Sequence, residues 1–189
     1  FDLASITKVV STTSGIMKLA DQNKINIDNP IASYLPDFKG KKKKHKKQKS
    51  KITIRDLLSH SSGLPAFKQY FKMEKTKEFI VDSIYGTEPI RAIGDTTIYS
   101  DVGAIMLGEI VEKASGLPLE VFMDSMVFEP LGMSTTFFKP PKEKLHRIIP
   151  TEIDLKGNLI HGYVHDENAH ILGGVAGHAG LFSTAKDLA

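Results

Sequence analysis

The sequence predicts a mostly helical chain with long loops, and three observations support this. Apolar residues recur every three or four positions in several segments, most clearly over residues 102–114. Capping and turn residues separate these segments from one another. No run of alternating residues is long enough to predict a set of paired strands. In a compact domain, loops as long as these indicate that parts of the domain are missing.

The first predicted helix starts near the N-terminus and fades at residues 21–23. Its apolar residues recur at helical spacing and are expected to form one buried face: Ile6, Val9, Val10, Ile16, Met17 and Ala20. Thr53 and Asp56 form a variant capping box that opens a short helix ending near His60. Further helices are expected at residues 31–35, 75–85 (with Phe79, Ile80 and Ile84 inward), 102–114 and 118–126, and from Ser183 or Thr184 onward, with short strands around Ile148 and Leu159.

The charge of the chain is concentrated in one tract. Residues 39–51 contain nine lysines and no acid, which leaves 16 basic and 22 acidic residues elsewhere, although the whole chain carries +3. Such a tract could bind nucleic acid or anionic lipid, or it could be a solvated loop whose charges repel one another. No aromatic residue is interleaved to stack on bases, so we expect a flexible insertion at 40–50 and no nucleic-acid partner.

Composition excludes several classes of protein. The chain has no cysteine, so disulfides, cysteine nucleophiles and thiolate metal sites are ruled out. No apolar run is long enough to cross a bilayer. Four histidines between residues 161 and 178 lie near Asp166 and Glu167, but their spacing matches no helical zinc motif. We therefore expect neither a metal nor a cofactor. The absence of an initiator Met and a signal peptide indicates a processed or truncated beginning.

Ser5 and Lys8 form the first candidate for chemistry. Three residues apart at a helix start, they lie on one face, so the amine can reach the hydroxyl. The spacing alone means little, because a second match exists at Ser183 and Lys186. That match is explained by a helix cap made by Thr184 and Asp187. Ser5 could equally be a helix cap rather than a nucleophile.

Tyr99-Ser100-Asp101 strengthens the catalytic interpretation. It is the only Tyr-x-Asn/Asp triplet in the chain and lies on a turn before a helix, where side chains can point into a cleft. A phenol beside a lysine ammonium could exist partly as phenolate and act as general base toward Ser5. The alternative is a structural tyrosine, half-buried at the end of a strand.

Five stretches occur in an order that points to one family. They are residues 1–8 (Phe-Asp-Leu-Ala-Ser-Ile-Thr-Lys), 54–65 (Ile-Arg-Asp-Leu-Leu-Ser-His-Ser-Ser-Gly-Leu-Pro), Tyr99-Ser100-Asp101, 130–133 (Pro-Leu-Gly-Met) and 180–188 (Gly-Leu-Phe-Ser-Thr-Ala-Lys-Asp-Leu). Together they resemble the serine β-lactamase and penicillin-binding-protein superfamily, in particular its class C and esterase-like branch. The resemblance spans nearly the whole chain, with the lysine tract as a local insertion.

The resemblance implies an α+β fold of the β-lactamase/transpeptidase type. In this family an antiparallel sheet, built from both chain ends, packs against a helical lobe. Residues 1–189 would hold the lobe and little of the sheet, as a partial domain. His178-Ala179-Gly180 could match the family's third motif, a Lys- or His-x-Gly triplet. We expect it instead to belong to a glycine-rich loop, because a helix cap rather than a strand follows. The third motif, and the oxyanion-hole N–H that its strand would supply, would then be missing, so this fragment alone is expected to be inactive.

Carried over by residue, the resemblance implies that Ser5 is the acyl-accepting nucleophile, with Lys8 and Tyr99 as proton-transfer partners. Asp101 stands where the family usually has Asn. An ionised Asp only accepts hydrogen bonds and would pair with Lys8, which puts recognition of a β-lactam amide in doubt. His165 and Asp166 lie in a loop that would border the cleft and could contact substrate.

Three functions follow as hypotheses. The first is a serine hydrolase that forms an acyl-enzyme with a small-molecule or peptide substrate, on an ester, D-amino-acid peptide or β-lactam carbonyl. The second is a non-catalytic relative that binds a ligand or partner, and the third is nucleic-acid binding through the lysine tract. An extracytoplasmic location is implied by the resemblance alone.

Overall fold

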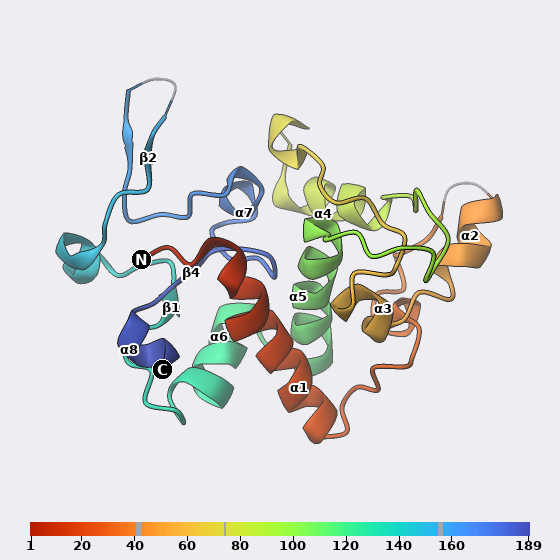
Figure 1. Ribbon diagram of the computed structural model, residues 1–189, viewed down its shortest axis with the longest axis horizontal. Coiled ribbons are helices and arrows are strands. Elements are labelled where there is room, and N and C mark those ends of the chain that lie inside the picture. Colours follow the sequence, from red (N-terminus) through yellow and green to blue (C-terminus); the bar gives the residue numbers. More distant parts are fainter. Residues whose placement is uncertain (41–42, 74, 155–156) are drawn as a thin grey trace.

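Helix α5 (Asp101–Ser115) lies at the centre of the computed structural model, which describes residues 1–40, 43–73, 75–154 and 157–189 (Figure 1). The Ser100 hydroxyl caps its start by accepting the Gly103 N–H (3.1 Å). Gly116 ends it with φ +75°, a left-handed conformation that suits glycine. Its apolar side chains are buried by contacts with α1 (Ser14–Asp21), α3 (Ile54–Leu58), α4 (Lys77–Tyr85) and α6 (Leu119–Met123). The predicted central helix is confirmed.

The N-terminal helix exists, but its predicted buried face is only partly right: Ile16 is buried, whereas three of the six predicted residues are exposed. The segment is a 3₁₀ turn, η1 (Ala4–Ile6), followed by a π-helix, η2 (Lys8–Thr13), and then α1. A π-helix bonds each residue to the fifth along, so it turns the buried face away from where regular helical spacing places it. Ile6, Val9 and Met17 are accordingly 51%, 66% and 66% exposed. The inward side chains are Lys8, Ser11, Thr12, Ile16 and Leu19.

Most other predicted helices are confirmed. Thr53 and Asp56 form the expected capping box, with each side chain accepting the other residue's N–H (3.1 and 2.8 Å). Helix α4 buries Ile80 and Ile84 as predicted, but Phe79 points outward and is exposed. The remaining helical elements are η3 (Ile31–Ser33), η4 (Tyr70–Met73), η5 (Asp124–Phe128), η6 (Lys142–Arg147), α7 (Glu167–Ile171) and α8 (Ala185–Leu188).

The lysine tract contains a docked helix where we expected a flexible loop. Helix α2 (Lys43–Lys49) lies at the opposite end of the long axis from the chain termini (Figure 1); residues 41–42 lie outside the described part. Lys49 is fully buried, and its ammonium donates to the carbonyls of Tyr85 and Thr87 at the end of α4. His45 pairs with Glu88 at 2.8 Å. These inward contacts, one turn apart on α2, explain why the segment is ordered despite its charge.

The strands are short and antiparallel, consistent with an α+β fold in which helices dominate. Strand β1 (Phe137–Phe138) pairs with β4 (Leu181–Phe182), with Phe137 opposite Phe182. Strands β2 (Glu152–Ile153) and β3 (Leu159–Ile160) form a hairpin that projects from the body (Figure 1). The strand predicted near Leu159 is confirmed. The one predicted around Ile148 is wrong, because η6 ends there.

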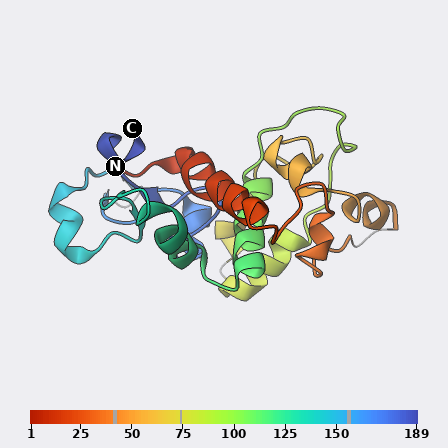
Figure 2. The same ribbon diagram turned by 90° about the horizontal axis from the view of Figure 1, so that it is seen from below.

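Strand β4 links the two ends of the chain. Phe1 and Ser183 exchange hydrogen bonds, and Leu3 N–H donates to Leu181 O (2.9 Å). Both views therefore show the N- and C-terminal ends on the same side (Figures 1 and 2). In the part of the chain that the structure describes, no helix is both long and apolar enough to span a membrane.

The glycine-rich loop before β4 crosses α5 at very close range. A Cβ on Gly177 would overlap the carbonyl oxygen of Ala104, and one on Gly108 would lie 2.9 Å from the Gly177 Cα. Only glycine allows two backbones to approach this closely. Thr12 of η2 holds the other side of the loop, where its hydroxyl donates to Gly177 O (2.7 Å). The loop is thereby fixed between η2 and α5, next to Lys8.

Candidate active site

Ser5 lies on an exposed and sharply turned segment. Ala4, just before it, has φ +45°, which is strained for a residue with a side chain and costs about 1–2 kcal/mol. The Asp2 carboxylate braces this turn by accepting the N–H of Ala4 and the N–H of His165, both at 2.8 Å. The turn therefore presents the Ser5 hydroxyl to solvent at the start of η1–η2.

The Lys8 ammonium lies at the centre of the site and is only 7% exposed. It donates to Ser5 Oγ at 2.8 Å and to the carbonyl oxygen of His178 at 3.1 Å. Its third partner is Asp101 Oδ1, 2.7 Å away. The ammonium thus donates two hydrogen bonds and is neutralised by one ion pair. The predicted reach from Lys8 to Ser5 and the predicted pairing of Asp101 with Lys8 are both confirmed.

Tyr99 lies beside this ammonium and is 53% exposed. The Lys8 Nζ is 4.9 Å from the centre of the Tyr99 ring, within the range of a cation–π contact. On another side, the His60 ring lies 4.8 Å from the Tyr99 ring, tilted by 49°. Ser5, Lys8, Tyr99 and Asp101 thus gather at one place, although 91 positions separate Lys8 from Tyr99 in the sequence.

Asp166 and His178 form a pair behind Lys8. His178 Nε2 lies 2.8 Å from Asp166 Oδ1, and the His178 side chain is 1% exposed. Asp166 also caps α7 by accepting the Ala169 N–H at 2.8 Å. Burial favours the protonated Asp166, but the hydrogen bond and charge of His178, the Ala169 N–H and the Lys8 charge outweigh it, so the pKa of Asp166 lies below its ordinary value.

The predicted substrate contacts at His165 and Asp166 have other partners in this structure. His165 Nε2 pairs with Glu152 at 3.0 Å, toward the β2–β3 hairpin. Asp166 is engaged by His178. The His178 side chain is itself buried, so it faces no open surface where a ligand could reach it. A two-residue strand, β4, does separate His178-Ala179-Gly180 from the last helix, which the prediction did not include.

Two site residues were missed by reasoning from the sequence. His60 was noted only as the end of a short helix, but its Nδ1 accepts the Ser100 N–H, so that nitrogen carries no proton. His178 supplies a backbone carbonyl, which no side-chain pattern can reveal. The signals that were available are the adjacency of His60 to a Ser-Ser-Gly turn and the glycines that flank His178.

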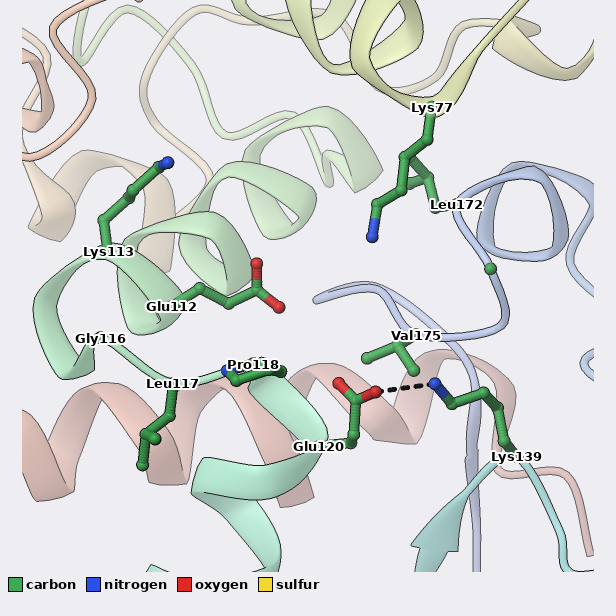
Figure 3. Close-up of a pocket in the computed structure, with 11 residues that line it drawn as sticks. Lys77, Glu112, Lys113, Gly116, Leu117, Pro118, Glu120, Lys139, Leu172 and Val175 are labelled. Atoms are coloured by element: carbon green, nitrogen blue, oxygen red, sulfur yellow. Dashed lines mark hydrogen bonds and ion pairs between the residues drawn. The ribbon is translucent and has the colours of Figure 1, made fainter.

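Several hollows of the described chain lie away from Ser5. Figure 3 shows one of about 550 Å³, at the C-terminal end of α5, with Lys77, Glu112 and the ion-paired Glu120 and Lys139 (2.7 Å) in its wall. None of the predicted site residues lines it. Among the described residues, no group of three or more metal-binding side chains comes together.

Comparisons with known proteins agree with this fold. A family model described as Beta-lactamase matches residues 1–189. An N-acetylmuramyl-L-alanine amidase from Bacillus subtilis is 34% identical over 216 residues, covering 100% of this chain and 48% of the amidase. A protein from Escherichia coli, provisionally named a D-alanyl-D-alanine carboxypeptidase, is 36% identical over 215 residues. The match covers 100% of this chain and 49% of the length of that protein.

Solved structures show the same similarity in three dimensions. FmtA from Staphylococcus aureus has a TM-score of 0.76 at 24% identity, covering 100% of this chain and 50% of its own. A class C β-lactamase has a TM-score of 0.76 at 20% identity, with 100% and 48% covered. The chain therefore spans about half the length of the relatives it matches.

Proposed function

Because the chain belongs to the beta-lactamase family of serine hydrolases and their relatives, we propose that it carries the nucleophile of such a hydrolase, at Ser5. One observation carries the proposal: the Lys8 ammonium donates to Ser5 Oγ at 2.8 Å, while the His178 carbonyl and the Asp101 carboxylate hold it in place. A cation held against a hydroxyl stabilises the oxyanion that forms when the hydroxyl loses its proton. The second Ser-x-x-Lys match lacks this arrangement, because Ser183 is buried against Thr136.

The contacts of the Lys8 ammonium also support a proposal for the proton-transfer groups. As an ammonium that donates two hydrogen bonds and pairs with a carboxylate, Lys8 has no lone pair to accept a proton from Ser5. Tyr99 is then the base: its phenolate takes the Ser5 proton as Oγ attacks the substrate carbonyl carbon. When the bond from that carbon to the leaving nitrogen or oxygen breaks, Tyr99 returns the proton to the leaving group. Water then hydrolyses the ester on Ser5 by the same route.

The proposed substrates are D-amino-acid peptides or esters rather than β-lactams. Asp101 accepts hydrogen bonds but cannot donate one to a substrate carbonyl, and its Oδ1 is engaged by Lys8. Two matched relatives carry names of an amidase and a D-alanyl-D-alanine carboxypeptidase, both of which would act on amide bonds. These names support the proposed substrate class, although the chain spans only about half the length of each relative.

Covalent labelling tests the proposal. The full-length protein containing this chain is treated with a fluorophosphonate probe, and the adduct is mapped by mass spectrometry. We expect an adduct on Ser5 that is lost in Ser5→Ala and strongly reduced in Lys8→Met. Ser183→Ala is the matched control, since it removes the serine of the second motif, and it should label as the wild type does.

The opposite result has a clear meaning. If the folded wild-type protein forms no adduct on Ser5, or if Ser5→Ala labels undiminished, the hydrolase proposal is wrong. A folded, unlabelled protein that binds muropeptide-like ligands would then be the non-catalytic relative considered above.

A further inference from the structure

His60 is a residue of the site that the proposed chemistry does not use. It follows α3 and has φ +56°, in the left-handed region that only a few per cent of residues other than glycine occupy. A conformation of this kind persists only where surrounding contacts fix it. The contacts of His60 therefore show which part of the structure keeps it in this conformation.

Those contacts converge on the segment that carries Tyr99. The carbonyl of His60 accepts the N–H of Ile98 at 2.9 Å, and its Nδ1 accepts the N–H of Ser100 at 3.1 Å. The residues before and after Tyr99 are thus both bonded to His60. The imidazole ring also lies against the Tyr99 ring, 4.8 Å between centres. One residue therefore contacts the Tyr99 segment at three points.

The ring can accept the Ser100 N–H on Nδ1 only when it is neutral. Nδ1 accepts a hydrogen bond, so the single ring proton belongs on Nε2. Burial disfavours the charged ring, and the nearby Lys8 charge opposes it further, so the pKa of His60 lies below its ordinary value of 6.5 despite the opposing effect of Asp101. The groups that face it are Lys8 from η2, Asp101 from α5 and Tyr99 itself.

We propose that His60 is the positioning residue for Tyr99: its neutral ring and its carbonyl fix the segment on both sides of the tyrosine, and so aim the phenol at Ser5. The inference rests on the proposed function, in which Tyr99 is the base. A displacement of about 1 Å in a catalytic group can lower a rate about 100-fold, so loosening this segment has a kinetic effect without removing any group that touches substrate.

Two variants separate the side chain from the backbone. His60→Asn keeps an acceptor near the position of Nδ1 and tolerates the positive φ, whereas His60→Gly tolerates the φ but has no acceptor. Asn23→Gly is the matched control, because Asn23 has the same φ of +56° at the end of α1, away from Ser5. Each full-length variant is first checked for folding by circular dichroism.

The kinetic readout is inactivation by a fluorophosphonate, resolved into a maximal rate and a binding constant. We expect His60→Gly to lower the maximal rate about 10- to 100-fold with little change in binding constant, and His60→Asn to stay within about threefold of wild type. Wild type should also slow as the pH falls through the pKa of His60, which lies below 6.5, because the protonated ring no longer accepts the Ser100 N–H. His60→Asn should lack this slowing. An undiminished rate in His60→Gly, or equal losses in the Asn and Gly variants, overturns the inference.

A second readout needs no activity. The ¹⁵N–¹H resonance of the Ser100 amide should titrate with His60 in the wild type and stay constant in His60→Asn. An amide that does not titrate in the wild type also overturns the inference. Failure of wild type to label on Ser5 would sink the proposed function, while the Ser100 resonance would still decide whether His60 holds the Tyr99 segment.

Discussion

Replacing Asp166 should reveal how strongly the loop behind Lys8 is anchored. Its carboxylate makes two contacts, a cap on the Ala169 N–H and a bond to the buried His178 ring, each at 2.8 Å. A cap contributes about 1 kcal/mol and a charged hydrogen bond about 1.5–3 kcal/mol. We therefore expect Asp166→Ala to lower the free energy of unfolding by about 2.5–4 kcal/mol. Asp166→Asn keeps the cap and should cost about 1–2 kcal/mol.

The pH dependence of this effect has a definite sign. Because the pKa of Asp166 in the fold is below its ordinary value of 3.8, the charged form stabilises the native state. That contribution is complete above pH 3.8 and is lost as the pH falls through the lower, folded value. The difference between wild type and Asp166→Asn should therefore be constant near neutral pH and shrink in acid.

Urea unfolding of the full-length protein at several pH values measures both quantities. Asp82→Asn serves as a control, since Asp82 is an exposed carboxylate on α4 and should change stability by less than about 0.5 kcal/mol. A loss below about 1 kcal/mol for Asp166→Ala would refute the reasoning. So would equal losses for the Ala and Asn variants.

Three further predictions concern other contacts. Gly177→Ala should lose more than about 3 kcal/mol of stability in urea unfolding, because its Cβ would overlap the backbone of α5; an unchanged stability would contradict the close crossing. Asp101→Asn should raise the rate of penicillin acylation on Ser5, followed by mass spectrometry, because the amide can donate to a substrate carbonyl; an unchanged rate would remove Asp101 as the reason for the proposed substrate class. Lys49→Met should cost about 2–3 kcal/mol by leaving the Tyr85 carbonyl without its charged donor, and a neutral effect in urea unfolding would show that α2 is not anchored there.

Sequence periodicity predicted where helices lie better than which way they face. The central helix and the caps at Thr53 and Gly116 follow from local rules, and the structure has them. The predicted buried face of the first helix was only partly right, because a π-helical start is not visible in a pattern of apolar residues. The prediction of a loop around Lys49 was wrong because it rested on charge alone. In the folded chain, carbonyl acceptors at the end of α4 make the burial of Lys49 favourable.

In the candidate site, too, some residues could be predicted from the sequence and others could not. The proximity of Ser5, Lys8 and Tyr99 could be predicted because the residue types and the order of the surrounding motifs resemble one family. The pairing of Asp101 with Lys8 followed from the chemistry of an acid at that position, and the 2.7 Å contact confirms it. The carbonyl of His178 could not be found, because a backbone acceptor 170 positions from Lys8 depends on how the chain folds back rather than on residue type.

The close crossing of Gly177 over α5 has a mechanical consequence. Asp101 is the first residue of α5, and the loop that carries the His178 carbonyl rests on the same helix at Gly108. Two of the three partners of the Lys8 ammonium are thus tied to the same helix. A substitution that displaces α5 would therefore disturb both partners at once.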